Sequence, residues 1–496
     1  MTWHPARIRS QALPFTMRTV LISTYELGHQ PFGLASPAAW LTERGAQVTC
    51  LDLSRESLRE EPVREADLIA FYVPMHTATR LALSLLDTVK GLNPRAHICF
   101  YGLYAPVNEG YLRAAGADTV LGGEFEEGLA RLADRLSSGE LLSNAPQSDP
   151  VISLARQKFR VPERSGLPLL VRYAHVMMPG GAERIAGYTE ASRGCKHLCR
   201  HCPIVPVYNG VFRIVGRDVV LEDIRRQVEA GAQHITFGDP DFFNGPTHAM
   251  AIVEAMHREF PRLSYDATIK IEHLLKHADH LPQLRATGCL FVTSAVESVD
   301  DRILERLDKG HTRSDFLRVI ELFAGAGLVL QPTFVPFTPW TTLEGYRDLL
   351  EVLAGNDLAE NVAPIQLAIR LLIPAGSRLL ELAEIREGVD AFDSAALYYP
   401  WRHGDPRVDA LASDLQQIVE RGEKLGRSRL QIFERIIARA WENVGSEVRR
   451  NPPRPRAGAP IPRLDEPWYC CAEPTKDQLV SIGCAKETAR QPGAFV

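Results

Sequence analysis

The sequence predicts an α/β protein built from an N-terminal Rossmann-like domain with a parallel sheet, a partial (β/α)6 TIM-type barrel, and a helical C-terminal region that ends in a cysteine-containing tail. Three observations support this prediction. Two series of short apolar runs alternate with helical patterns, a polar and proline-containing stretch separates the two series, and a proline-rich run precedes the tail. With 496 residues, the chain is long enough for two or three domains.

The first series of apolar runs predicts a Rossmann-like domain over residues 17–140, after an N-terminal arm over residues 1–16. Each run is short and rich in β-branched or aromatic residues, which favours strands joined by crossover helices. In chain order the runs are RTVLIST, AQVTCLDL, ADLIAFYV, AHICFYG and ADTVLGG. No GxGxxG pattern follows the first run, so we do not expect a nicotinamide site.

The second series predicts a barrel over residues 186–382, after a linker over residues 141–185. Its strands are expected at GYTEASRG, QHITFGD, SYDATIKI, LFVTSAV, LVLQPTFV and IQLAIRLL, and segments such as VLEDIRRQVEAG between them have apolar residues at helical spacing. The active site of such a barrel lies at the carboxyl ends of its strands. A helical region is predicted over residues 383–450, and a proline-rich linker and tail over residues 451–496.

The composition narrows the class of function. The formal net charge is -5 without long runs of one sign, which argues against a nucleic-acid-binding protein. The sequence contains no stretch of about 18 apolar residues, so no membrane span is predicted. The first residues lack an apolar core long enough for a signal peptide. Nine cysteines are too few for a disulfide scaffold, so we expect a cytoplasmic protein whose clustered cysteines form a metal or redox site.

Cys195, Cys199 and Cys202 carry the strongest chemical signal. They form a C-x3-C-x2-C motif directly after the first predicted barrel strand, so three thiolates can converge on one metal centre. Three cysteines on a four-iron cluster leave one iron open to bind a small molecule, much as an open position distinguishes catalytic from structural zinc. The alternative is a structural zinc site that takes His197 or His201 as its fourth ligand.

The motif and its position closely resemble the radical S-adenosylmethionine (radical SAM) superfamily, over about residues 186–380. The resemblance implies that the three cysteines hold a [4Fe–4S] cluster whose fourth iron binds the amine and carboxylate of S-adenosylmethionine (SAM), and it implies an electron donor such as flavodoxin or ferredoxin. An electron that enters the cluster would cleave SAM, and the adenosyl radical would act on a small-molecule substrate. His201 stands where the superfamily usually has an aromatic residue.

The same resemblance assigns further residues to SAM. In FGDPDFFN, the backbone of Gly238, Asp239 and Pro240 is expected to receive the amino group of SAM, while Asp241 and Phe243 suit the core or the site equally. In SAVESVDD, Glu297 and Ser298 match the ribose-contacting stretch of the superfamily. The remaining expected contacts, with the adenine, come from the fifth and sixth strands: Thr333, Val335, Arg370 and Ile373, of which the apolar residues suit the core equally well.

The N-terminal domain resembles the cobalamin-binding domains of many radical SAM enzymes. LGGEFEEGL at 121–129 is similar to their terminal Gly-Gly-Glu-x-Glu motif. Their D-x-H-x-x-G motif is missing, because the loop after the first strand reads YELGHQPFG and holds only His29 in a different context. Two alternatives stay open: cobalamin binds without a protein ligand to cobalt, or the domain no longer binds it and covers the barrel.

The tail carries adjacent cysteines, Cys470 and Cys471, in EPWYCCAEPTKD. Neighbouring thiols can form a strained disulfide or chelate a soft atom such as As(III), and Glu473 can accept a proton. The letters CCAEP match the CUAEP/CCAEP-tail radical SAM proteins, some of which have selenocysteine at the position of Cys471. We therefore expect Cys470, Cys471 and Glu473 to handle the substrate at the mouth of the barrel.

Two other functions stay open for the tail. One is transfer of the 3-amino-3-carboxypropyl group of SAM to arsenite or another thiophilic acceptor. The other is a non-enzymatic redox or metalloid sensor that uses Cys470, Cys471 and Cys484. The remaining cysteines, Cys50, Cys99 and Cys289, lie in or beside predicted strands and are expected in the core.

Overall fold

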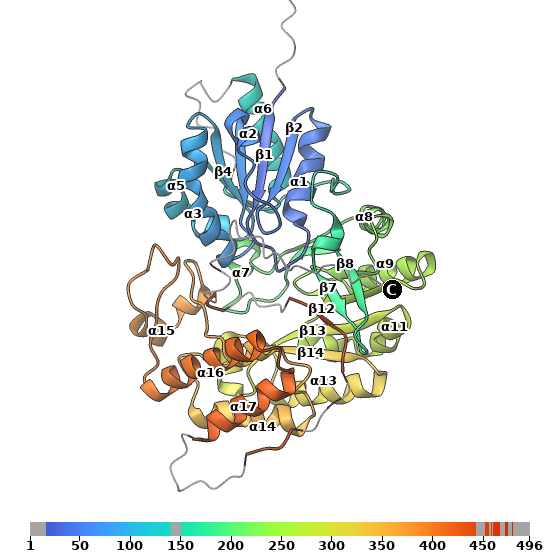
Figure 1. The fold of residues 1–496 in the computed structure, drawn as a ribbon, viewed down its shortest axis with the longest axis vertical. Coiled ribbons are helices and arrows are strands. Elements are labelled where there is room, and N and C mark those ends of the chain that lie inside the picture. Colours follow the sequence, from blue (N-terminus) through green and yellow to red (C-terminus); the bar gives the residue numbers. More distant parts are fainter. Residues whose placement is uncertain are drawn as a thin grey trace, which may run out of the picture.

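The computed structural model describes residues 16–139 and 150–442 and, further on, residues 452–455, 458, 460–466, 472–474 and 479. The chain forms two α/β units that lie one above the other, with a helical region at the far end of the second unit (Figure 1). No helix within the described ranges is long and apolar enough to cross a membrane.

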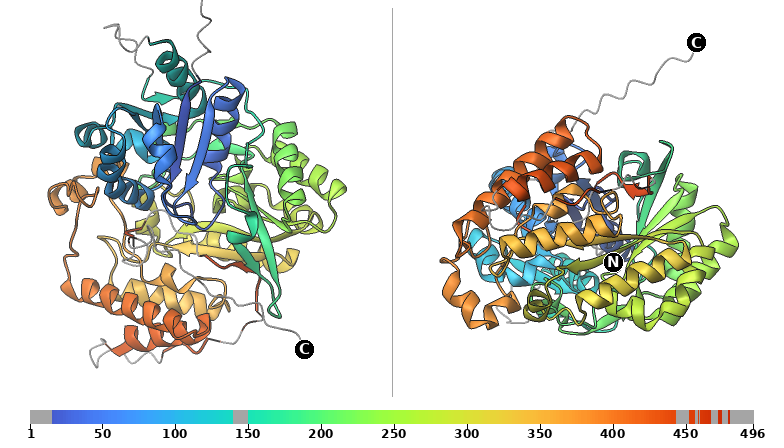
Figure 2. Two further views of the ribbon diagram at one scale, coloured as in Figure 1. Left: turned by 45° about the horizontal axis from the view of Figure 1, so that its top comes forward. Right: turned by 90° about the horizontal axis from the view of Figure 1, so that it is seen from below.

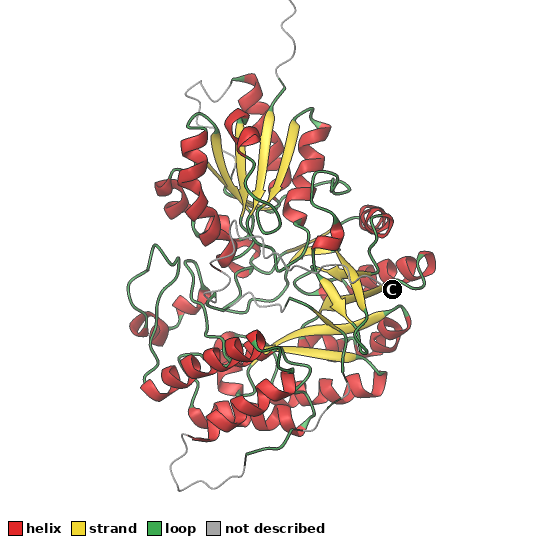
Figure 3. Cartoon of the chain, viewed as in Figure 1, coloured by secondary structure: helices red, strands yellow, loops and turns green. Residues whose placement is uncertain are grey.

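The N-terminal unit is a parallel sheet in the order β2-β1-β3-β4-β5-β6. All five apolar runs of the first series form strands, and helices cover both faces of the sheet (Figure 3). Helices α1 and α6 bury one apolar core against it, and α2, α3 and α5 bury another. The elements are β1 (Arg18–Ser23), α1 (Phe32–Glu43), β2 (Gln47–Asp52), α2 (Glu60–Glu65), β3 (Leu68–Tyr72), α3 (His76–Leu92), β4 (His97–Tyr101), α4 (Tyr104–Val107), α5 (Glu109–Ala115), β5 (Thr119–Gly123), α6 (Phe125–Ser138) and β6 (Ile152–Ser153).

The second unit is a curled sheet in the order β14-β13-β12-β11-β8-β7-β15, which forms a half-barrel rather than a closed one (Figure 2). Strands β8 and β11 to β14 are parallel, whereas β7 and β15 pair antiparallel at one edge. The strands are β7 (His175–Met177), β8 (Glu183–Thr189), β11 (His234–Phe237), β12 (Ser264–Thr268), β13 (Cys289–Glu297), β14 (Val329–Phe334) and β15 (Arg463–Leu464). A separate antiparallel pair joins β9 (Ser192–Gly194) and β10 (Phe212–Ile214).

Two parts of the predicted barrel differ in detail. The run GYTEASRG divides into β8 and β9, because the chain turns after Thr189 and β9 pairs with β10. The sixth predicted strand is a 3-10 turn, Pro364–Leu367, followed by one parallel bridge between Phe337 and Arg370. Pro364 starts that turn and has no N–H to donate to a strand ladder, which is consistent with the loss of regular pairing.

Helices pack on the outside of the half-barrel and share one large core with the C-terminal helices. The predicted segments VLEDIRRQVEAG and RSDFLRVIELFAGAG form α8 and α13, and a capping box between Thr312 and Asp315 starts α13. The helices are α7 (Val205–Tyr208), α8 (Arg217–Glu229), α9 (Pro246–Glu259), α10 (Ile271–Lys276), α11 (Leu281–Ala286), α12 (Asp301–Leu307), α13 (Arg313–Ala326), α14 (Leu343–Gly355), α15 (Ala383–Gly388), α16 (Pro406–Lys424) and α17 (Arg429–Glu442).

Candidate functional site

A cavity lies where the carboxyl ends of the two parallel sheets face each other. The volume of this cavity is about 240 Å³. The N-terminal domain contributes the loops after β1, β3, β4 and β5, and the half-barrel contributes the ends of β8, β11, β12 and β13. Ligands of parallel sheets bind at this edge, so the cavity is the natural candidate for the active site.

The three motif cysteines lie on the loop after β9, beside this cavity. Cys202 lines the cavity, and its N–H donates to the carbonyl of Cys199 at 3.2 Å, so the second half of the motif forms a turn. Burial raises the pKa of the Cys195 thiol to about 11. A thiol in this environment becomes a thiolate when it binds a metal, since the metal replaces the proton.

Neighbouring elements hold the cysteine loop in place. The N–H of Lys196 donates to Asn244 Oδ1 at 3.1 Å, and the N–H of Arg200 donates to the carbonyl of Leu307 at 2.9 Å. Asp241 Oδ2 lies 3.3 Å from Nε2 of His197, which belongs to the cysteine loop, and 2.7 Å from His273 Nδ1. Burial raises the pKa of the Asp241 carboxyl, but these histidines outweigh it and hold the pKa below its usual range.

The geometry argues against the zinc alternative. Within the ranges that the structure describes, the one group of three potential ligand atoms within 4.8 Å of one another joins Cys195, His197 and Asp241. A structural zinc site with three cysteines would bring all three sulfur atoms that close. Three separated thiols instead suit a cluster in which each binds a different iron.

The Gly238–Pro240 segment follows β11 and lines the cavity, and its expected contact with the amino group of SAM stays a prediction. The carboxyl of Asp239 is already used within the fold: it accepts from the N–H of Ala191 at 2.8 Å and from Ser192 Oγ at 2.6 Å. Burial raises the pKa of Asp239 to about 7. The backbone of the segment, rather than this side chain, is therefore what remains for a ligand. Phe243 is core, packed edge-on to His277 and His280.

Glu297 and His201 meet behind the cysteine loop. Glu297 ends β13 with a φ of 69°, and its Oε1 lies 3.1 Å from His201 Nε2 and 3.4 Å from Lys309 Nζ. Burial raises the pKa of Glu297, but Lys309 and His201 outweigh it and hold the pKa at about 2. Glu297 and Ser298 line a smaller hollow beside α12 instead of the main cavity, so their expected contact with the ribose stays a prediction.

Thr333 and Arg370 do not line the main cavity. Thr333 is buried in β14, and its Oγ1 has no hydrogen-bond partner. Arg370 points away toward the C-terminal region: it pairs with Asp409, lies 4.1 Å from the centroid of the Trp401 ring, and lies 3.7 Å from Glu473 Oε1. Their roles beside the adenine stay predictions, as do those of Val335 and Ile373, which are buried in the apolar core.

Described residues of the tail contact both domains. Leu464 of β15 lines the cavity. Glu466 Oε1 accepts from Tyr25 Oη at 2.7 Å, and a Cβ added to Gly28, where φ is +74°, would lie 2.4 Å from Glu466 Oε2. Further on, Ala472 forms an antiparallel bridge with Leu371. Cys470 and Cys471 lie outside the described residues.

An ion network that the sequence did not reveal joins the two domains at the cavity. Arg193 of β9 is buried and pairs with Glu126 at 2.6 Å and Glu190 at 2.6 Å, with Glu124 at 3.6 Å. Glu124 and Glu126 belong to LGGEFEEGL, so this motif binds the barrel through Arg193. Burial raises the pKa of Glu124 to about 7, although the nearby Arg193 lowers it. No local pattern indicates such a partner, because Arg193 and Glu126 are far apart in the chain.

The N-terminal crevice bears on the two cobalamin alternatives. A ligand of this sheet would enter at the switch point between β1 and β3, where the ring of Tyr72 already lies. A Cβ added to Gly33 would come within 2.1 Å of that ring, which also packs against Tyr101 at 5.4 Å and Phe125 at 6.0 Å between centroids. These side chains occupy the space that the nucleotide tail of cobalamin would need. This favours the alternative in which the domain no longer binds cobalamin.

Comparison with known proteins supports the interpretation of the cysteine motif. Residues 189–349 match the family model described as the Radical SAM superfamily. The matched range is thus similar to the radical SAM domain, and the match implies a [4Fe–4S] cluster and SAM as cofactors. All three motif cysteines lie within the matched range.

Individual relatives and solved structures match more of the chain than the family model does. The chain is 25% identical over 324 residues to a hopanoid C-3 methylase from Methylococcus capsulatus, which covers 63% of this chain and 62% of that protein, so the chain spans about three fifths of that relative. A solved structure of the cobalamin-dependent SAM radical enzyme OxsB, with aqua-cobalamin and SAM bound, has a TM-score of 0.65 at 14% identity and covers 82% of this chain and 67% of its own. The methyltransferase TsrM from Kitasatospora setae, with tryptophan and a SAM analogue bound, has a TM-score of 0.61 at 16% identity and covers 86% and 90%. At these identities the likeness to the two structures shows the fold alone.

Proposed function

We propose that the chain cleaves SAM reductively and uses the radical to modify a small molecule in the cavity between its domains, because residues 189–349 match the Radical SAM superfamily model. The observation that carries this proposal is the position of the cysteine loop: Cys202 and the Gly238–Pro240 backbone line the same cavity. A bound cluster and the amino group of SAM would therefore lie close together at the barrel side of that cavity.

The residues of the chain have separate tasks in this proposal. The thiolates of Cys195, Cys199 and Cys202 hold the cluster, which supplies the electron that breaks a carbon–sulfur bond of SAM. Backbone carbonyls of Gly238–Pro240 accept from the amino group of SAM. The N-terminal domain covers the strand ends and limits the access of water to a reactive radical. An external one-electron donor such as flavodoxin or ferredoxin completes the system.

Cobalamin is not needed for this chemistry. A cobalamin-dependent reaction of the kind named for OxsB would require Tyr72 and Tyr101 to leave the crevice that they fill. The hydroxyl of Tyr101 also donates to the carbonyl of Gly33 at 2.8 Å, so its movement would leave a buried acceptor unpaired. We therefore derive no step through cobalamin.

A nucleoside assay on the full-length protein tests the proposed function. After anaerobic cluster reconstitution and reduction with SAM present, we expect 5′-deoxyadenosine and no methylthioadenosine, with or without arsenite. Methylthioadenosine formed with arsenite would instead show aminocarboxypropyl transfer, and the absence of any cleavage would favour the sensor. Hydroxocobalamin added in a parallel sample should elute separately from the protein on gel filtration, and co-elution would contradict the filled crevice.

The tail cysteines are proposed to handle the substrate, on the strength of the CCAEP motif and of the contacts that Glu466 and Ala472 make on either side of them. In Cys471→Ser we expect product formation from the natural substrate to be lost, because a hydroxyl is a far weaker nucleophile and soft-atom ligand than a thiolate. Formation of 5′-deoxyadenosine without substrate should persist. The matched control is Cys484→Ser, and full turnover by Cys471→Ser would exclude a substrate role for this thiol.

A further inference from the structure

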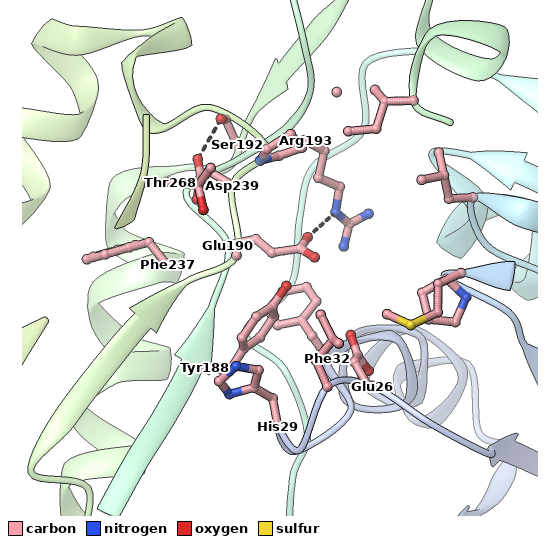
Figure 4. Close-up of a pocket in the computed structure, with 18 of the residues that line it drawn as sticks. Glu26, His29, Phe32, Tyr188, Glu190, Ser192, Arg193, Phe237, Asp239 and Thr268 are labelled. Atoms are coloured by element: carbon pink, nitrogen blue, oxygen red, sulfur yellow. Dashed lines mark hydrogen bonds and ion pairs between the residues drawn. The ribbon is translucent and has the colours of Figure 1, made fainter. Parts of the chain in front are cut away.

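We propose that the N-terminal wall of the cavity binds the ammonium group of an amine-bearing small molecule, held between Glu26 of the N-terminal domain and Glu190 of the half-barrel. This inference rests on the proposed function, since it names the class of molecule that the radical would reach. Glu26 follows β1 and Glu190 follows β8, so the two carboxylates enter the cavity from opposite domains (Figure 4).

Glu26 supplies the observation that points to a ligand. Its side chain lines the cavity and is only 7% exposed, yet its Oε2 atom has no hydrogen-bond partner. An unpaired carboxylate oxygen away from bulk water costs free energy, and proteins seldom keep one without a partner. A ligand that donates hydrogen bonds or carries positive charge would supply what this oxygen lacks.

Acidic groups outnumber basic groups around the cavity. Four carboxyl groups line it, from Glu26, Glu190, Asp239 and Asp266, whereas the lining holds one arginine, Arg193. Arg193 is already shared among Glu190, Glu124 and Glu126. The remaining basic side chain of the lining is His29, and burial lowers its pKa to about 4, so it is neutral near pH 7. The cavity therefore favours a cation.

The titration behaviour of the two acids agrees with this electrostatic picture. Burial raises the pKa of Glu26 well above its usual range, and the negative charges of Glu190 and Asp52 raise it further. Burial likewise raises the pKa of Glu190, although Arg193 opposes this. An ammonium group between the two carboxylates would relieve their repulsion and restore both to the ionised form.

The walls of the cavity are also suited to a cation. Aromatic rings line the cavity together with the two acids, among them Phe32, Tyr72, Tyr104, Phe125 and Tyr188. Cations bind over such faces, most strongly when they are desolvated. A polyanionic or strongly acidic substrate would meet the four carboxylates with no free guanidinium, so this class is disfavoured.

SAM is itself a cation, and the test must separate it from the proposed ligand. Gly238–Pro240 and Cys202 mark the barrel side of the cavity, whereas Glu26 comes from the N-terminal side. We would therefore use full-length, cluster-reconstituted protein with saturating SAM, and titrate benzylamine and benzyl alcohol by calorimetry. The two probes have nearly the same shape and differ in charge at pH 7.5.

We expect benzylamine to bind roughly tenfold more tightly than benzyl alcohol, and Glu26→Gln to lose that preference while it keeps the affinity for the alcohol. The control Glu61→Gln makes the same change at an exposed acid of α2 and should leave both affinities unchanged. Equal binding of the two probes by the wild-type protein, or an unchanged preference in Glu26→Gln, would overturn the proposal.

Thermal unfolding of Glu26→Gln provides the second readout. A carboxyl whose folded-state pKa is raised destabilises the fold as pH rises above its unfolded value of about 4.3. Replacing it with a neutral amide should therefore raise the unfolding midpoint at pH 8, and a lowered midpoint would instead indicate a structural role. SAM cleavage is measured in the same samples: amine binding without 5′-deoxyadenosine would reject the proposed function and leave the amine site intact.

Discussion

Cys199→Ser is expected to abolish reductive cleavage of SAM and to remove most of the iron from the reconstituted protein. Cys199 is the middle cysteine of the motif and is buried within the loop after β9, where its carbonyl accepts from the N–H of Cys202 at 3.2 Å. A serine hydroxyl is a poor ligand for iron in an iron–sulfur cluster, and two thiolates do not hold a four-iron cluster. Iron content, the visible absorbance of the cluster and 5′-deoxyadenosine formation measure the effect.

The matched control for this prediction is Cys99→Ser. Cys99 is also buried, but it lies in β4 within the apolar core of the N-terminal domain. The same chemical change at this position should leave about four irons per chain, the content of one [4Fe–4S] cluster, and should leave SAM cleavage intact. Iron and cleavage retained by Cys199→Ser, or lost by Cys99→Ser, would place the cluster outside the predicted motif.

The parallel strands of both domains were predictable because their signal is local. A strand buried on both faces is a short apolar run, and each such run in the first series forms a strand. The less regular strands carried no such signal. Strand β15, for example, has only two residues, Arg463 and Leu464, and follows a proline-rich run that indicated a break. An edge strand tolerates nearby prolines, since one side of its backbone needs no ladder partner.

The sequence signal for the cluster motif was likewise local, whereas no local signal indicated the cavity. Three cysteines within eight residues predict a metal centre, and the half-barrel places them at its strand ends. Glu26 and Glu190, in contrast, are ordinary acids at the ends of two strands in different domains. Only the packing of one sheet edge against the other brings them to one cavity and leaves Glu26 Oε2 without a partner.

Only local sequence patterns were predictive, and this explains why some residues assigned by resemblance line the main cavity and others do not. Gly238–Pro240 lines the main cavity, because its position follows directly from the end of β11. Arg370 belongs to a predicted strand that forms isolated bridges instead of a regular ladder, and its side chain turns toward Asp409 and Trp401. Where the strand pattern is lost, the direction of a side chain no longer follows from its place in the sequence.

Arg193→Met is expected to lower the stability of the protein by roughly 3–5 kcal/mol, the usual cost of leaving buried charges without their partner. Arg193 is 7% exposed and is shared by Glu124, Glu126 and Glu190. Its removal also breaks the ion pairs that link Glu124 and Glu126 of the N-terminal domain to β9. The midpoint of urea unfolding measures the loss, and the control Arg64→Met, which breaks an exposed pair with Glu60, should change it little.

The pH dependence of the Arg193→Met defect distinguishes loss of charge pairing from loss of packing. Burial raises the pKa values of Glu124 and Glu190, and without the guanidinium they rise further above their unfolded value of about 4.3. Burial also raises the pKa of Glu126, but Arg193 outweighs it and holds that pKa below its usual range, so loss of the guanidinium raises it as well. Such groups fold with a proton bound, so stability falls as pH rises through this window. The defect should therefore be smaller at pH 5 than at pH 8, and Arg193→Met/Glu126→Gln should recover part of it. A defect of the same size at both pH values would mean that Arg193 acts through its contacts with Phe32, Phe125 and Phe159 instead.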